Sequence, residues 1–191
     1  MYYLLESPFY PCRWMDDTPY HPELRWERGV KFTSPVPKPL EGFTLQPFDE
    51  NSRDDGPELP PYFHDNMPVF RDDLIAAMRK CGATNLDAYD AVILDPDSGK
   101  KITNYKAVNL IGLVSAADMK KSKYTVHTQP ALIDVDFDSL VIDPSKAHDL
   151  TIFRLAESTN AILCHERLVE YLDRNGFEGK ITFLDPAECA V

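Results

Sequence analysis

Proline is spread very unevenly along this chain, and its distribution limits what the first third can fold into. Of the sixteen prolines in 191 residues, twelve lie at or before Pro68. Because proline lacks a backbone N–H donor and fixes φ, we expect this part to contain neither long helices nor central strands. It is also rich in aromatic residues, including Trp14 and Trp26, which disordered segments lack. We therefore expect a largely irregular part, built of extended pieces and turns that pack against the rest of the chain.

One stretch of this part has a different composition. Residues 49–61 read DENSRDDGPELPP, which is acidic, poor in apolar residues and bounded by Pro60 and Pro61. Such a composition is typical of an exposed loop or linker. The sequence therefore predicts a proline-rich N-terminal part over residues 1–61, packed on the body and with an acidic loop at 49–61, followed by a domain over residues 62–191.

Residues 62–191 carry clear helix and strand patterns. Apolar residues at helical spacing predict a helix over 70–81, which Gly82 ends, and a second helix around Leu168 and Leu172, which Asn175-Gly176 ends. Turn-forming residues at 95–100 predict a hairpin. Local hairpins with at least two helices indicate the α+β class, with a mixed or antiparallel sheet of short strands. Among the runs that predict strands are residues 89–94, 105–114, 151–155, 161–164 and 181–184.

The chain is strongly acidic, with 31 Asp and Glu residues against 20 Lys and Arg, for a formal net charge of −11. A nucleic-acid backbone would be repelled, so we expect no nucleic-acid partner, and a basic protein is the natural complement. No run approaches the roughly 20 apolar residues that span a bilayer, and no signal peptide opens the chain. We therefore expect no membrane association and a cytoplasmic location, in which the four cysteines are reduced thiols.

Candidate catalytic and metal-binding residues are few. Cys164 and His165 invite a thiol-nucleophile hypothesis, but neighbours on a strand point to opposite faces, so we interpret them as a core cysteine and a histidine at a helix start. The four other histidines are isolated, with no partner at zinc-ligand spacing. Residues 95–99 resemble the start of a calcium loop, but glycine stands one position early and Lys106 replaces the closing glutamate, which indicates a turn. The sequence predicts no catalytic residue, no metal site and no cofactor.

Asp134, Asp136 and Asp138 form the most suggestive polar group. If this segment is extended, alternation places the three carboxylates on one side and Val135 and Phe137 on the other. One interpretation is the solvated face of an edge strand, which charge also protects from unwanted pairing. Another is a stripe that receives Lys or Arg from a partner protein. A metal or acid–base role is a third, although no histidine or second carboxylate motif is tied to these residues.

A second group of carboxylates belongs to the acidic loop, and a basic partner would be attracted to both groups. A mobile loop loses entropy on binding, whereas Val135 and Phe137 hold the strand face in place. We therefore expect the Asp134 stripe to make the tighter contact. The loop carboxylates are Asp49, Glu50, Asp54, Asp55 and Glu58.

Several segments, taken in order along the chain, carry a resemblance to a known family. They are Met67–Phe70, the helix end at Cys81–Asn85, Tyr105–Asn109, Phe153–Leu155, and the strand, helix, glycine and strand of Ala161–Phe183. This succession is similar to family eleven of the immunity proteins found beside polymorphic toxins, including effectors of contact-dependent and type VI secretion systems. The resemblance covers about residues 60–186 and rests on packing and turn residues.

Members of that family are non-enzymatic proteins that protect a producing cell by binding a cognate toxin. The resemblance therefore implies an immunity-type domain over residues 62–191, a tight complex with a toxin encoded nearby, and no catalytic residue to carry over. The acidic charge suits a basic toxin. Two alternatives stay open, a cytosolic enzyme that uses Asp134, Asp136 or Asp138 with a histidine, and a general protein-interaction adaptor. Both a monomer and a homo-oligomer are compatible with the sequence.

Overall fold

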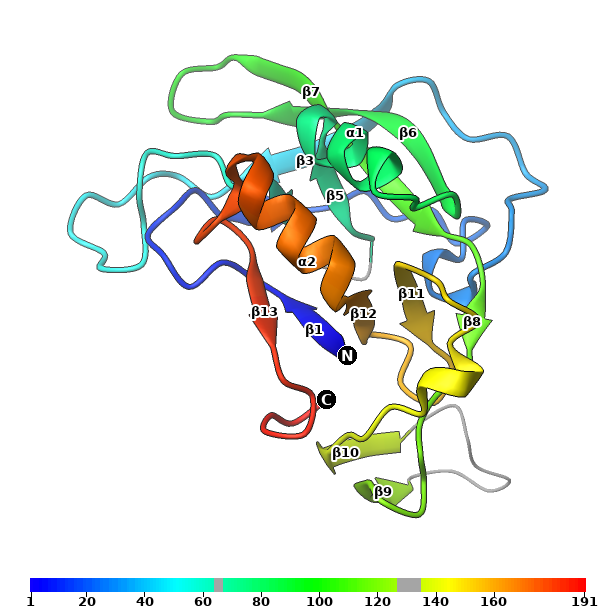
Figure 1. The fold of residues 1–191 in the computed structure, drawn as a ribbon. Coiled ribbons are helices and arrows are strands. Elements are labelled where there is room, and N and C mark those ends of the chain that lie inside the picture. Colours follow the sequence, from blue (N-terminus) through cyan, green and yellow to red (C-terminus); the bar gives the residue numbers. More distant parts are fainter. Residues whose placement is uncertain (64–66, 127–134) are drawn as a thin grey trace.

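The computed structural model describes residues 1–63, 67–126 and 135–191 (Figure 1). The described part has more strand than helix, with two α-helices, α1 (Asp72–Lys80) and α2 (Glu166–Leu172), which agrees with the predicted α+β class. The strands are β1 (Tyr2–Glu6), β2 (Met15–Asp17), β3 (Leu40–Leu45), β4 (Tyr62–Phe63), β5 (Val69–Arg71), β6 (Leu86–Leu94), β7 (Lys101–Leu110), β8 (Leu113–Val114), β9 (Lys123–Val126), β10 (Val135–Ser139), β11 (Ile152–Leu155), β12 (Ile162–His165) and β13 (Thr182–Leu184). No helix in these residues is long and apolar enough to cross a membrane.

The described strands form three sheets. One has the order β13-β1-β12-β11-β8, a second has the order β2-β3-β6-β7-β5-β4, and β9 pairs with β10 alone. The two larger sheets are mixed, because β8 runs parallel to β11 and β3 runs parallel to β6, whereas the other pairs, including β9 with β10, are antiparallel. β6 and β7 form the hairpin that the turn at residues 95–100 predicts.

Two strands of the N-terminal part lie inside sheets, so the expectation that this part lacks central strands is wrong. β1 pairs with both β12 and β13, and β3 pairs with both β2 and β6. The prolines flank these strands without occupying them: Pro8 follows β1, and Pro39 and Pro47 enclose β3. Every residue of β1 and β3 therefore keeps its N–H donor for the ladder. Each of the two larger sheets thus combines strands from before and after residue 61.

One strand in each of the two larger sheets, β7 and β12, has buried residues on both faces, to which successive side chains point in turn. On β7, Tyr105 and Ala107 point to one buried cluster, while Val108 and Leu110 point to another. β12 behaves in the same way, with Cys164 on one side and Leu163 on the other. The cluster shared by both sheets and both helices, which we call the central cluster, includes Leu5, Leu74, Met78, Val108, Leu110, Ile162, Cys164 and Leu168.

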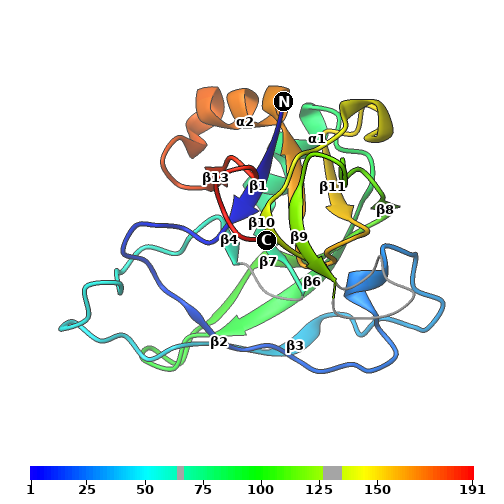
Figure 2. The same cartoon turned by 90° about the horizontal axis from the view of Figure 1, so that it is seen from below.

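The two helices cover this central cluster and lie along the same side of the molecule (Figure 2). In α1, Leu74 and Met78 are buried, and Asp72 and Asp73 occupy the first turn, where the helix dipole favours acidic side chains. The predicted helix began at residue 70, but Phe70 belongs to β5 and pairs with Lys106 of β7. α2 continues into a wider turn that ends near Gly176, whose φ of 92° is the left-handed value expected at this stop.

The outer face of the six-stranded sheet is covered by the proline-rich segment. Trp26 is buried there with Leu40 and Phe43, and its ring packs edge-on against Phe32 and Tyr89, at centroid distances of 4.8 and 5.9 Å. Edge-on packing of aromatic rings adds to the burial of their apolar area. The N-terminal aromatic residues thus supply the apolar cover that this face requires.

We predict that Leu5→Ala lowers the free energy of unfolding by about 2–5 kcal/mol, because it leaves a cavity in the central cluster. Urea denaturation followed by tryptophan fluorescence measures this change. Phe9→Ala is the control: Phe9 is 75% exposed, so its truncation changes stability by less than about 0.5 kcal/mol. Equally small effects of both variants would show that β1 is not part of the cooperative core.

Candidate functional site

The two groups of carboxylates lie in different parts of the molecule. Asp134 falls outside the described residues. Asp136 and Asp138 lie on β10 and are exposed, whereas Val135 and Phe137 between them are buried, so the predicted alternation is confirmed for these four residues. The acidic loop lies well away from β10 in both views (Figures 1 and 2).

The acidic loop is held to the segment before β2 by backbone hydrogen bonds. The carbonyl oxygen of Asp54 accepts from Cys12 N at 3.2 Å and from Trp14 Nε1 at 3.0 Å. Gly56 N donates to Cys12 O at 3.1 Å, and Arg13 N donates to Glu58 O at 2.9 Å. The loop is exposed as expected, but these contacts hold its residues 54–58 in place. They therefore weaken the entropic reason for preferring the Asp134 stripe, which rested on a mobile loop.

A glycine allows the loop to approach this closely. Gly56 is buried, and a Cβ atom at this position would clash with the carbonyl group of Pro11. The two backbones meet side by side, with Cys12 and Asp55 in a parallel bridge. Only a residue without a side chain fits between them.

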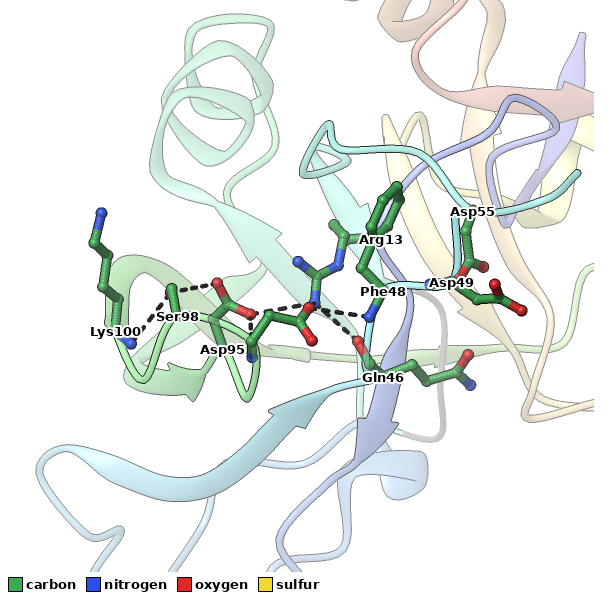
Figure 3. A network of polar contacts seen from close by, with 9 residues as sticks. Arg13, Gln46, Phe48, Asp49, Asp55, Asp95, Ser98 and Lys100 are labelled. Carbon is green, nitrogen blue, oxygen red and sulfur yellow. Dashed lines mark hydrogen bonds and ion pairs between the residues drawn. The ribbon is translucent and has the colours of Figure 1, made fainter. Parts of the chain in front are cut away.

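Arg13 fixes the far end of the same region by joining three segments that are distant in sequence (Figure 3). Its Nη2 atom lies 2.8 Å from Gln46 O, 2.8 Å from Asp97 Oδ2 and 3.2 Å from Asp95 Oδ1. The Asp97 carboxylate also accepts from Phe48 N at 3.0 Å. The chain that enters the acidic loop is thereby tied to the β6–β7 turn.

The turn itself is ordered by its own side chains. The Ser98 hydroxyl donates to Asp95 Oδ2 at 2.6 Å. This bond, followed by the Asp97 N–H and Arg13, holds the pKa of Asp95 below its ordinary value. The interpretation of residues 95–99 as a turn is confirmed, because they connect β6 to β7.

A groove opens between the acidic loop and the segment before β2. It encloses about 670 Å³ and is lined by Pro8, Phe9, Tyr10, Pro11, Trp14, Gln46, Ser52, Arg53, Asp54 and Asp55. Phe9, at 75% exposure, presents its ring to solvent. Aromatic and proline side chains therefore form one wall of this groove, which we call the aromatic groove, and two carboxylates belong to the other wall.

Among the described residues, only one of the loop carboxylates forms an ion pair with a cation of this chain. Glu58 forms an ion pair with Lys180, with 3.7 Å between Oε1 and Nζ. In the part of the chain that the structure describes, no ion pair involves Asp49, Glu50, Asp54 or Asp55. Asp55 instead accepts from the backbone N–H of Asp49 at 3.0 Å. The loop thus concentrates negative charge on a backbone that is fixed by other contacts.

The side chains of Cys12 and Tyr10, which lie next to the loop, are not ionised at neutral pH and so are not activated as nucleophiles or bases. Burial, with Glu58 and Asp55 nearby, raises the pKa of Cys12 to about 11, so its thiol stays protonated at neutral pH. Burial, with Cys12 and Glu58 nearby, also raises the pKa of Tyr10 to about 12. Both groups are therefore neutral packing residues near pH 7.

Cys164 and His165 occupy the positions that the sequence predicts. Cys164 is fully buried in the central cluster, and burial raises the pKa of its thiol strongly. His165 is the N-cap of α2, where Nδ1 accepts from Arg167 N at 3.1 Å. The interpretation as a core cysteine followed by a helix-start histidine is confirmed. Among the described residues, no cluster of three or more His, Cys, Asp or Glu side chains is placed to hold a metal ion.

Sequence reasoning missed the aromatic wall of the groove and the role of Arg13. The letters PFYPCRW at residues 8–14 did show an unusual mixture of proline, aromatic and basic residues. What they could not show is the pairing of Cys12 with Asp55, more than forty positions away.

We predict that Gly56→Ala separates the acidic loop from its support and lowers the free energy of unfolding by about 1–3 kcal/mol, because the new methyl group meets a backbone carbonyl. Hydrogen exchange measures the separation: the amides of Gly56 and Arg13 lose protection. Glu50→Ala, in the exposed part of the same loop, serves as the control and leaves both amides protected. Unchanged protection in the Gly56→Ala variant would contradict the close approach described above.

Comparison of the sequence with protein-family models and with curated proteins gave no match.

Proposed function

We propose that this protein is an immunity protein, which binds a cognate basic bacterial toxin in the cytoplasm and neutralises it without enzymatic activity. The proposal draws on the sequence resemblance and on the net charge of −11. In this proposal residues 62–191 form the immunity-type body, and the proline-rich residues 1–61 carry the binding loop.

The observation that carries the proposal is the way the acidic loop is held. Its support comes mainly from backbone hydrogen bonds to Cys12 and Arg13 and from the Trp14 indole. The carboxylates of Asp49, Glu50 and Asp54 are therefore not needed to hold the loop by pairing with cations of the same chain. A loop arranged in this way presents charge to a partner at little further cost in backbone entropy.

The charge distribution affects both steps of binding. At long range, the excess of acidic groups attracts a basic protein and raises the association rate, an effect that salt weakens. At contact, the carboxylates lose their hydration, and cations of the partner must offset this cost. This requirement selects against neutral or acidic proteins. Slow dissociation then keeps the toxin inactive for as long as the complex lasts.

We predict that co-expression relieves the toxicity of one toxin encoded beside this protein, and that the purified pair binds with a dissociation constant below about 1 μM. Cell viability and calorimetry measure the two effects. Raising the salt concentration slows association more than it speeds dissociation.

The control is an unrelated acidic protein of similar net charge, which gives no protection. If every toxin candidate encoded beside the gene binds more weakly than about 1 μM, the proposed function is wrong. Turnover of a small molecule by the purified protein would favour the enzyme alternative instead.

A further inference from the structure

We propose that the aromatic groove receives one arginine or lysine side chain from a basic loop of the toxin, held between the Phe9 ring and the carboxylates of Asp54 and Asp55. This inference rests on the proposed function and deepens it, because it names the surface and the chemistry of the group that fills it.

The walls of the groove match the two halves of such a side chain. A long cationic side chain has an apolar stem and a charged end. Pro8, Phe9 and Trp14 line the groove and suit the stem, while Asp54 and Asp55 line it and suit the charged end. An aromatic ring beside a carboxylate adds a cation–π attraction to the ion pair.

Phe9 exposes a large aromatic ring among the residues that line the groove. Phe9 is 75% exposed, next to Pro8, which is buried. A large aromatic side chain in a hollow at the surface is typical of the positions that dominate binding energy in protein interfaces. Here the two carboxylates of the lining, Asp54 and Asp55, outweigh its one cation, Arg53, so charge complementarity selects a cationic occupant.

The same region already holds one guanidinium group of this chain in this manner. The Cζ atom of Arg13 lies 5.9 Å from the centroid of the Phe48 ring, and its Nη2 atom pairs with Asp97 at 2.8 Å. Ring and carboxylate thus combine around an arginine that also donates to the carbonyl oxygen of Gln46, a residue of the groove lining (Figure 3). The lining of the groove contains the same two kinds of group, an aromatic ring and carboxylates.

The β10 surface offers less to a cation. Asp136 and Asp138 lie on an exposed strand, and the aromatic residue between them, Phe137, is buried on the opposite face. Lys123 of the neighbouring strand β9 pairs with Ser139 in register and adds positive charge beside them. We therefore expect a single cationic side chain to bind more tightly in the aromatic groove than at the β10 surface.

The first test uses the peptides Gly-Arg-Gly and Gly-citrulline-Gly, which differ in charge but hardly in shape, followed by NMR of the full-length protein. The arginine peptide should shift the signals of Phe9, Asp54 and the Trp14 indole, and the citrulline peptide should not. Phe9→Ala should abolish these shifts. Equal shifts from both peptides, or arginine shifts confined to Asp136 and Asp138, would overturn the inference.

The second test uses the toxin encoded beside the gene and two variants that lose the same charge. Asp54→Asn with Asp55→Asn should weaken binding about tenfold and flatten its salt dependence, whereas Asp136→Asn with Asp138→Asn should change affinity less than threefold. Phe9→Ala should speed dissociation about tenfold. Arg53→Gln removes the groove's own cation and should leave binding equal or tighter.

The outcomes separate the two proposals. If the wild-type protein binds no such toxin but the arginine peptide still binds in the groove, the proposed immunity function is wrong and the proposed cation site in the groove is supported. If the toxin binds and only the Asp136 and Asp138 variant loses affinity, the proposed function is supported and the proposed cation site in the groove is wrong. Unfolding curves for each variant confirm that a loss of binding is not a loss of folding.

Discussion

The structure depends on strands that are apolar on both faces. On β7, Tyr105 and Ala107 point to one side of the sheet, and Val108 and Leu110 point to the other. All four side chains are apolar or aromatic and buried. Burial of such area is the main favourable term in folding. Two short helices cover one side, where α1 and α2 meet the central cluster. Within the described residues, no α-helix covers the other side of the six-stranded sheet, and the proline-rich segment covers it with side chains such as Trp26.

The need to cover this face of the six-stranded sheet explains why the N-terminal part is folded despite its prolines. A segment that crosses the face of a sheet needs extended backbone and apolar side chains, and it does not need helical hydrogen bonds. Its connections then lie at the margin of the sheet, where Arg13 ties Gln46 to the β6–β7 turn. The acidic loop is supported by the same arrangement, so the candidate site arises from residues that are distant in sequence.

Local patterns predicted the parts of the fold that local physics decides. Both helices, the β6–β7 hairpin and the alternation of Asp136 with Phe137 follow from spacing and turn residues. Proline misled the prediction for β1, because a proline excludes only its own position from a ladder and says nothing of a strand that ends before it. The aromatic groove was beyond prediction, since a pairing such as Cys12 with Asp55 leaves no periodic signal in the sequence.

The loop's support has a consequence for how this protein can change over evolutionary time. Backbone hydrogen bonds from Cys12 and Arg13 are indifferent to which side chains the loop carries, apart from Gly56. Substitutions at Glu50 or Asp54 can therefore alter the charge pattern while the path of the chain is conserved. Under the proposed function, single substitutions at such positions change recognition without first lowering stability. Backbone support of this kind thus separates the path of the loop from the charges that it carries.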